Sequence, residues 1–356
     1  MTTKRTKPFH RLRVAEVRPL CDDAAAVTFA VPDDLRADFS FRPGQSLTLR
    51  KTVNGREERR SYSICSPPGG PMRIGVREVP GGTFSEWLVR GTRRGDEVDV
   101  QTPSGSFAAD PDTGGRHVLI AAGSGITPIM SIAATLLRQP DTHVVVIYGN
   151  RRTDSVMFAD ELADLKDGYG PRLELIHVLS REQRAVDLFS GRLDADRIRL
   201  LLRTLVPVEA VDHFWLCGPH GMVEAAQSVL HEFGVSAGSV HQELFFVEDK
   251  APQRAPQADA GAPESRSDVT IILDGRATTL ALPRDTSVLE GAQRSRDDLP
   301  FACKGGVCGT CRARVTAGTA DMRRNYALEP DEVAVGFVLT CQTFPASDAV
   351  TIDFDA

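Results

Sequence analysis

The chain has 356 residues, of which 41% are hydrophobic and 25% charged, and its formal net charge is −6. It has no apolar run of about 18 residues, which excludes a membrane-spanning helix, and its negative charge argues against nucleic acid as the main partner. The basic residues 1–17 lack the apolar core of a secretory signal, so we expect a cytoplasmic protein with reduced thiols.

Residues 8–112 are predicted to form an antiparallel β-barrel. Short segments with alternating apolar residues occur at 12–17, 25–31, 46–50, 61–65, 72–79 and 96–100. Glycine and proline separate them in the sequences PGQ, SPPGGP, VPGGT and TPSGS. Many short strands with such turn signals are typical of a small antiparallel barrel.

Residues 113–247 are predicted to form a doubly wound α/β domain with a parallel sheet. Buried-strand patterns occur at 116–123, 142–150, 172–180 and 211–218. Helical patterns occur between or after them at 126–139, 155–165 and 221–234. Strands that alternate with helices in this way favour a parallel sheet.

Residues 248–267 contain alanine, proline and charged residues but no large apolar side chain, which is typical of a linker. Residues 268–356 form a third predicted domain. Strand patterns lie at 269–275 and 278–282, and a helical pattern lies at 287–295.

Four of the seven cysteines suggest an iron–sulfur site in this last domain. Cys303, Cys308 and Cys311 have the spacing C-x4-C-x2-C, and Cys341 follows 30 positions later. Structural zinc sites usually use two paired knuckles, whereas three ligands on one loop and a distant fourth are typical of plant-type two-iron clusters. Zinc, free thiols and disulfides remain the alternatives.

Glycines between these cysteines support the cluster. A two-iron cluster with four thiolates is negatively charged, and its burial is costly without hydrogen bonds. Gly305, Gly306 and Gly309 would let the backbone turn tightly and direct N–H groups at sulfur. On these residues the domain at 268–356 resembles the plant-type ferredoxins, a β-grasp fold. Cys21, Cys65 and Cys217 lie outside the match.

The sequence RRSYSICS predicts a flavin site on a strand of the barrel. It contains Arg60, Ser61, Tyr62 and Ser63. Together with VPGGTFS downstream it resembles the flavin motif of the ferredoxin–NADP reductase superfamily. The resemblance implies that Arg60 pairs with the FAD pyrophosphate, Tyr62 packs on the isoalloxazine and Ser63 lies near its N5. An ordinary strand with a polar face is the alternative.

The resemblance implies further cofactor contacts along the chain. Gly82, Thr83 and Ser85 would offer donors to phosphate at the start of a short helix, and Val76 would contact the flavin. A glycine loop between a strand and a helix suits a dinucleotide phosphate, and here its sequence matches the superfamily motif G-x-G-x-T-P. The residues of this loop are Gly123, Ser124, Gly125, Ile126, Thr127 and Pro128. The C-G-P motif on the nicotinamide side corresponds to Cys217, Gly218 and Pro219.

The end of the strand at 172–180 predicts NADPH rather than NADH. Ser180 and Arg181 match the pair with which NADPH-using members hold the 2′-phosphate, and arginine can clamp it with two hydrogen bonds. Asn150 and Arg151 could add contacts. Glu182 follows directly, and an acid in this region favours the ribose hydroxyl of NAD. Surface solvation of the arginines is the alternative.

The order of electron transfer follows from cofactor chemistry. NADPH gives a hydride and a two-iron cluster accepts one electron at a time, so FAD belongs between them. Ser63, Thr127, Cys217 and Glu243 are then expected to position groups along the hydride path rather than act as strong acids or bases. Phe245 and Phe246 either cover the flavin ring or pack in the core.

Nearly the whole chain resembles the reductase components of ring 1,2-phenylacetyl-CoA epoxidases. The resemblance is carried by FRPGQSLTLR, RRSYSICS, ACKGGVCGTC and NYALEPDEVAVGFVLTCQ. The resemblance implies that a separate di-iron oxygenase subunit accepts the electrons. No pair of E-x-x-H motifs occurs here, so we expect the substrate to bind to another polypeptide. A reductase for a Rieske or steroid oxygenase is the alternative. The C-terminal domain carries 13 acidic and 9 basic residues from Asp268 onward, so a partner with a basic patch is expected.

Overall fold

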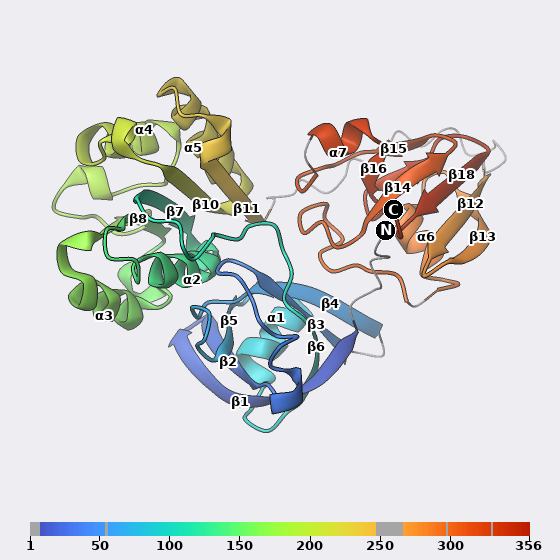
Figure 1. Cartoon of the computed structure of the whole chain (residues 1–356), viewed down its shortest axis with the longest axis horizontal. Helices are drawn as coiled ribbons and strands as arrows, with labels where there is room; N and C mark the ends of the chain where they lie inside the picture. Colours follow the sequence, from blue (N-terminus) through green and yellow to red (C-terminus); the bar gives the residue numbers. More distant parts are fainter. Residues whose placement is uncertain (1–7, 54–55, 247–265, 297, 329) are drawn as a thin grey trace. The chain divides into compact units, whose positions relative to one another are not determined.

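The computed structural model describes residues 8–53, 56–246, 266–296, 298–328 and 330–356. The chain divides into two compact units, one of Phe9–Val247 and one of Met1–Pro8 with Glu248–Ala356 (Figure 1). Of the predicted linker, residues 248–265 lie outside the described residues, and 266–267 already belong to a strand.

The first half of the larger unit is an antiparallel barrel. Its sheet has the order β4-β3-β6-β1-β2-β5. A bridge between Ile64 and Ile74 joins the two ends of this order. The strands are β1 (Phe9–Cys21), β2 (Ala24–Ala30), β3 (Ser46–Val53), β4 (Arg56–Ser63), β5 (Met72–Arg77) and β6 (Glu97–Gln101). Helix α1 (Thr83–Glu86) continues into a π-helical turn (Trp87–Gly91), and the two bury Phe84 and Leu88 in the barrel core.

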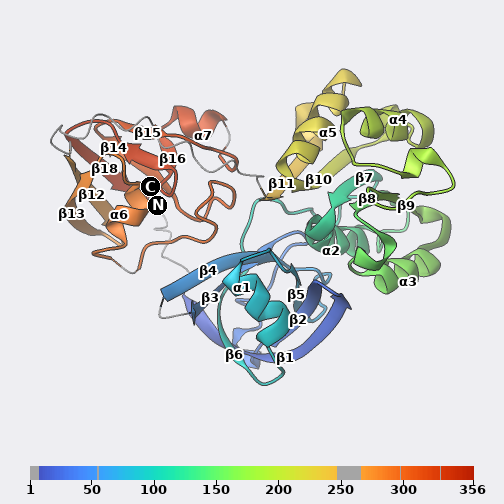
Figure 2. The ribbon, with the colours of Figure 1, turned by 180° about the vertical axis from the view of Figure 1, so that it is seen from behind.

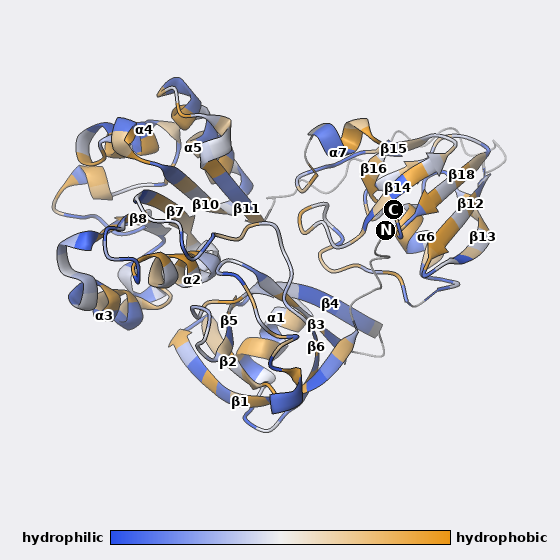
Figure 3. Cartoon of the chain, in the orientation of Figure 1, coloured by the Kyte–Doolittle hydropathy of each residue, from blue (hydrophilic) through white to orange (hydrophobic). Residues whose placement is uncertain are grey.

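The second half is a parallel sheet with helices on both faces, in the order β11-β10-β7-β8-β9. Its strands are β7 (Arg116–Ala122), β8 (His143–Asn150), β9 (Leu173–Leu179), β10 (His213–Pro219) and β11 (Val240–Phe246). Helices α2 (Ile126–Leu136) and α3 (Ala159–Tyr169) pack in one apolar cluster, and α4 (Ala195–Leu205) and α5 (His220–Glu232) pack in another. Figure 3 shows α2 largely in the hydrophobic colour, in keeping with its burial.

Short 3₁₀ turns complete the larger unit. They are Asp33–Leu35, Gly123–Gly125, Thr153–Ser155, Gly170–Arg172, Asp187–Phe189, Val208–Ala210 and Ala237–Ser239. The predicted helix at 155–165 begins four residues late, because Phe158 has a left-handed backbone with φ of 59° and precedes the first helical turn. Helix α4 and strand β11 were not predicted.

The smaller unit combines a mixed sheet, β13-β12-β18-β14-β16, with a two-stranded sheet of β15 and β17. The strands are β12 (Arg266–Leu273), β13 (Arg276–Pro283), β14 (Arg312–Ala317), β15 (Ala320–Met322), β16 (Phe337–Leu339), β17 (Thr343–Pro345) and β18 (Ala349–Asp353). Helices α6 (Val288–Ala292) and α7 (Pro330–Ala334) flank them, as Figures 1 and 2 show from opposite sides. The predicted fold class is thus confirmed in its three parts.

Candidate functional site

The glycine loop after β7 lies against the end of β10. A Cβ atom on Gly125 would lie 2.1 Å from the carbonyl oxygen of Cys217, so only glycine allows this approach. Gly123 has φ of 56°, and its carbonyl accepts a hydrogen bond of 2.9 Å from the Tyr148 hydroxyl. The carbonyl of Ser124 accepts a bond from Thr127 Oγ1. Because β7 lies between β10 and β8, the loop lies at the switch point of the sheet, where α/β folds bind ligands.

The same loop contacts the barrel. A Cβ on Gly75 of β5 would lie 2.5 Å from Thr127 Cγ2 and 2.8 Å from Phe158 Cζ. One helical turn later, Ser131 Oγ donates a hydrogen bond of 2.7 Å to the carbonyl of Ser66. Thr127 and Pro128 are buried, and the Thr127 hydroxyl is already bonded. The loop therefore connects the predicted flavin barrel with the predicted dinucleotide sheet.

Three of the four predicted positioning groups meet at this junction. Ser63 Oγ donates a hydrogen bond of 3.2 Å to Glu243, and Glu243 lies beside Cys217 in the parallel register of β10 and β11. Part of Glu243 is exposed to solvent, but its carboxyl group is buried. This burial raises the pKa of the carboxyl group to about 8. Burial and the neighbouring Glu243 raise the pKa of Cys217. Both groups are therefore mainly protonated at neutral pH.

Three side chains of the predicted flavin strand have different partners. Tyr62 stacks with Phe84 at 6.2 Å between ring centroids, and burial raises the pKa of its hydroxyl. Ser61 Oγ lies 3.0 Å from Thr48 Oγ1. Arg60 pairs with Glu58 at 2.8 Å and also donates to the carbonyl of Arg59. Arg60 would have to exchange the Glu58 carboxylate for a phosphate in order to bind FAD as predicted.

The second flavin segment forms a tight turn into α1. Ser85 Oγ accepts a bond from the N–H of Val79 and donates one to the carbonyl of Gly82, so its hydroxyl is engaged within the turn. The Thr83 side chain is exposed at the start of the helix. Val76 is fully buried in the barrel core, which leaves only its backbone for a cofactor contact.

Asn150 supports a ligand at the carboxyl edge of the sheet. It ends β8 and is 7% exposed, yet neither its Oδ1 nor its Nδ2 makes a hydrogen bond of good geometry within the described chain, although the amide lies near the Tyr148 hydroxyl. An unpaired buried amide is costly, and a bound molecule can supply both a donor and an acceptor. The ribose and phosphate groups of a dinucleotide have this chemistry, so the residues fit the predicted cofactor.

The loops after β8 and β9 are joined by backbone hydrogen bonds. The N–H groups of Ser180 and Arg181 donate to the carbonyls of Asn150 and Arg151 at 2.9 and 2.8 Å. Arg151 forms an ion pair of 2.5 Å with Asp23 of the barrel. The Glu182 carboxylate accepts bonds of 2.8 Å from both the N–H and the hydroxyl of Thr153. The acid therefore has a protein partner, whereas the Arg181 side chain is exposed.

Arg77 also lies at this junction, although the sequence did not predict it as a site residue. It ends β5, bonds to the Ser155 carbonyl of the sheet domain and pairs with Asp23 of the barrel at 3.1 Å. A Cβ on Gly123 would lie 3.4 Å from its Nη1, so this cation lies against the glycine loop. Its position at the last residue of a barrel strand, after MRIGV, was the available signal.

The ends of β10 and β11 close this side of the site. Gly218 pairs with Leu244, and Pro219 pairs with Phe246 across a register shift. A Cβ on Gly218 would lie 2.9 Å from Met222 Cε. Phe245 is half-buried and packs against the cluster that includes α2. The Phe246 side chain lies outside the described part of the structure.

In the smaller unit the four predicted ligands form two pairs. Cys303 and Cys308 interact through their side chains, as do Cys311 and Cys341. No three histidine, cysteine or acidic side chains among the described residues converge on a position for a single metal ion. Two adjacent thiol pairs are what a two-iron centre requires, since each iron takes two cysteine ligands.

The backbone around Cys303 favours a thiolate. Its sulfur accepts hydrogen bonds from the N–H groups of Gly305 at 3.3 Å and Val307 at 3.5 Å. The Cys308 thiol and these N–H groups lower the pKa of Cys303 to about 5. Gly306 and Gly309 have φ of 81° and 65°, as the tight loop needs. The residues thus fit the cluster.

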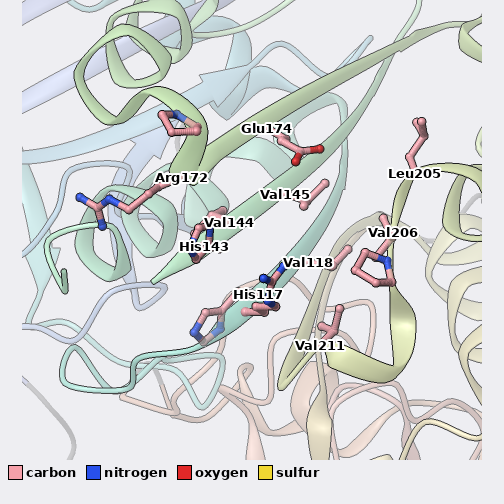
Figure 4. A pocket seen from close by; sticks show the side chains of 13 residues that line it. His117, Val118, His143, Val144, Val145, Arg172, Glu174, Leu205, Val206 and Val211 are labelled. Carbon is pink, nitrogen blue, oxygen red and sulfur yellow. The ribbon is translucent and has the colours of Figure 1, made fainter. Parts of the chain in front are cut away.

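Two hollows lie apart from these residues. A cavity of about 50 Å³ lies beside the first residues of β7 and β8 and includes His117, His143 and Arg172 in its lining (Figure 4). An open hollow of about 380 Å³ lies beside Arg184, Val186 and Phe189, in the loop that follows Arg181.

Among the described helices, none combines the length and the apolar composition that a membrane span requires.

Comparison with known proteins matches each of the three parts of the chain to a domain family. Residues 11–108 match the oxidoreductase FAD-binding domain, 119–228 the oxidoreductase NAD-binding domain and 271–346 the 2Fe-2S iron–sulfur cluster binding domain. Phthalate dioxygenase reductase has the same fold, with a TM-score of 0.63, 23% identity and coverage of 97% of this chain and 98% of that one.

Two relatives span nearly the whole chain. A subunit of the 1,2-phenylacetyl-CoA epoxidase from Escherichia coli is 41% identical over 98% of both chains. The ferredoxin reductase component of 3-ketosteroid-9-alpha-monooxygenase from Rhodococcus rhodochrous is 32% identical over 96% of both. The chain therefore belongs to the family of FAD- and [2Fe-2S]-containing oxidoreductases that includes this phenylacetyl-CoA epoxidase component.

Proposed function

We propose that the protein is the NADPH-dependent reductase of a phenylacetyl-CoA epoxidase, and that it delivers electrons to a separate di-iron oxygenase component. The observation that carries this proposal is the 41% identity over 98% of both chains to the Escherichia coli protein, compared with 32% for the steroid-oxygenase component. When bound, FAD converts a hydride from nicotinamide into single electrons that a two-iron cluster can accept.

On this proposal the barrel holds FAD. Tyr62 would pack on the isoalloxazine, and Arg60, released from Glu58, would bind the pyrophosphate. Ser63 would lie beside N5, where its bond to Glu243 orients both groups and keeps bulk water from the hydride path. Backbone groups of Val76, Gly82 and Thr83 would complete the cofactor contacts.

The sheet would hold NADPH at the glycine loop. The loop Gly123–Pro128 would approach the pyrophosphate, and the segment Cys217–Pro219 would border the nicotinamide. The side-chain amide of Asn150 would form hydrogen bonds with the ribose. Ser180 and Arg181 would bind the 2′-phosphate, and Arg151 would support this site while paired with Asp23. Glu182, bonded to Thr153, would not act as the acceptor for a ribose hydroxyl.

Reconstitution tests the acceptor. The purified reductase is mixed with NADPH and either a phenylacetyl-CoA epoxidase oxygenase component or a 3-ketosteroid monooxygenase component. We expect coupled product formation with the first and NADPH oxidation without product with the second. Equal coupling to the steroid component would favour the alternative function.

Cofactor preference is tested separately. We expect kcat/KM to be at least about tenfold higher for NADPH than for NADH, because a 2′-phosphate clamp is left unpaired by NADH. Arg181→Ala should remove most of this difference and leave the NADH value nearly unchanged. Equal values for the two cofactors in the wild-type protein would contradict the NADPH assignment.

A further inference from the structure

Charge is unevenly distributed in the iron–sulfur unit. Between Asp298 and Glu329 the sequence carries five basic residues but a single acid, Asp321, although the unit as a whole is acidic. The five are Lys304, Arg312, Arg314, Arg323 and Arg324. This segment also holds three of the four cluster ligands, so positive charge is concentrated where the cluster binds.

Two of these residues are joined to the cluster loop through their backbones. Gln342, the neighbour of Cys341, donates a bond of 2.8 Å from Nε2 to the carbonyl of Lys304. The carbonyl of Gln342 accepts a bond of 2.9 Å from the N–H of Arg323. Lys304 itself follows Cys303. Lys304 and Arg323 are therefore attached through Gln342 to the first and last ligands.

Both side chains are held in place without being neutralised by a close carboxylate. Lys304 Nζ donates to Gln293 Oε1 at 2.9 Å and lies 4.7 Å from the centre of the Phe301 ring. It has no ion pair within the described chain. Arg323 stacks at 3.6 Å over Phe344, and the carboxylate that pairs with it, that of Asp321, lies 3.9 Å away. Both residues are exposed.

Two of the other three basic residues of the segment have close partners of their own. Arg312 pairs with Glu332 at 2.8 Å and stacks over Phe337, and Arg314 donates to the carbonyl of Val335. The backbone of Lys304 adds a further observation. Its φ of 56° lies in the left-handed region, which disfavours every residue other than glycine. The lysine therefore stands at a position whose backbone favours glycine.

We propose that Lys304 and Arg323 form the docking face through which the cluster meets its electron acceptor, and that this acceptor is an oxygenase component with an acidic face. The identity of the acceptor rests on the proposed function. The charge of the face does not. The local charge next to the cluster, rather than the net charge of the unit, governs short-range approach because salt screens distant charges beyond about 8–10 Å. A partner with a basic patch, as expected from the net charge, is the opposite outcome.

Charged redox probes test the face on the full chain with its cofactors bound. The protein is reduced anaerobically, and stopped-flow absorbance follows oxidation of the cluster and of the flavin at separate wavelengths with two one-electron acceptors. Hexacyanoferrate(III) is an anion and hexaammineruthenium(III) is a cation. The variants are K304E/R323E, the single reversals K304E and R323E, the charge-conserving K304R/R323K and the control R276E, which changes the charge by as much as each single reversal. Arg276 is exposed and begins β13, on the side of the unit that Figures 1 and 2 show away from α7.

We expect the anion to oxidise wild-type cluster faster as ionic strength falls. The K304E/R323E change should slow the anion about tenfold at low salt and accelerate the cation, and both effects should vanish near about 0.5 M salt. K304R/R323K and R276E should stay within about twofold of wild type. A wild-type preference for the cation, or effects of K304E and R323E no larger than that of R276E, would overturn the basic docking face.

Two further measurements distinguish a role in docking from an effect on the cluster itself and test the proposed acceptor. Calorimetric titration of the oxidised chain with the epoxidase oxygenase component should show a dissociation constant raised about tenfold in K304E/R323E and unchanged in R276E. A shift in the cluster's reduction potential with unchanged probe kinetics and binding would show that the cations serve the cluster alone, and the docking proposal would be wrong. Normal probe kinetics with no binding to this oxygenase would contradict the proposed acceptor but leave the charge of the face intact.

Discussion

At the scale of single residues, one carboxyl group links the two halves of the larger unit. Glu243 comes from the last strand of the sheet, accepts a bond from Ser63 of the barrel, and lies beside Cys217. Its pKa of about 8 means that folding keeps a proton on a group that the unfolded chain would release near pH 4.5. The neutral carboxyl can orient Ser63 without placing a charge beside the flavin site.

This raised pKa predicts a pH dependence of stability. The folded state binds one more proton than the unfolded state between about pH 4.5 and 8, so the favourable contribution is complete below that window and is lost as pH rises through it. At saturating FAD, we expect the free energy of unfolding to fall by about 2 kcal/mol more in wild type than in Glu243→Gln between about pH 6 and pH 9. Chemical denaturation at both pH values measures this, and parallel curves for the two proteins would contradict it.

The pairing of the four cysteines leads to a prediction about the iron and sulfide content of cysteine variants. Cys311→Ser and Cys341→Ser should each lose nearly all of the about two irons and two sulfides per chain, because a hydroxyl is a poor replacement for thiolate. Cys21→Ser, outside the ferredoxin unit, should keep them. Iron and acid-labile sulfide analysis of anaerobically purified protein checks this. Full iron content in either ligand variant would remove that cysteine from the ligand set.

At the scale of elements, the loop between β7 and α2 depends on its contact with β10. Gly125→Ala would place a methyl group 2.1 Å from the Cys217 carbonyl oxygen, so backbone must move. We expect a loss of about 2–4 kcal/mol in stability and a KM for NADPH raised at least about tenfold. Gly168→Ala, in α3 with open space around it, should be neutral or stabilising. Thermal unfolding and steady-state kinetics distinguish them, and similar behaviour of the two variants would refute the close-approach argument.

Elements with strong local signals were predictable, and those that depend on tertiary contacts were not. Period-two and buried-strand patterns located the strands of the barrel and of β7, β8, β9 and β10. Strand β11 has mixed polarity because Glu243 faces an enclosed site, which hides its buried face in the sequence. The start of α3 was misplaced because the left-handed Phe158 is fixed by packing on Gly75 rather than by local propensity.

Helix α4 and the cation Arg77 were not predicted from the sequence, for different reasons. Helix α4 had a readable signal, since Asp194 caps it and Ile198, Leu201 and Leu202 follow on one face. Arg77 had a weak one, because a single arginine at a strand end is ordinary until the fold places it against the glycine loop. The spacing of the four cysteines was enough to predict them as cluster ligands, which stays a prediction. The ion pairs Arg60–Glu58 and Arg151–Asp23 could be found only from the coordinates.

At the scale of the whole molecule, the apolar cores are separate. Among the residues that the structure describes, the apolar clusters of the barrel and sheet contain none from the ferredoxin unit, whose own core includes Cys311 and Cys341. Metal binding to such a small unit contributes directly to its folding, because the unfolded chain has no preformed site. The two units should therefore respond differently to loss of iron.

Iron removal tests this independence. Treatment with a chelator under mild reducing conditions should lower the unfolding temperature of the ferredoxin unit by at least about 10 °C and leave the flavin unit within about 2 °C, so calorimetry should resolve two transitions. NADPH oxidation with hexacyanoferrate(III) should persist, since the flavin reacts with it directly, while electron delivery to the oxygenase component should be lost. Reconstitution with iron and sulfide should restore both the transition and the delivery. A single transition that moves as one on iron loss would mean that the two cores fold cooperatively despite their separate packing.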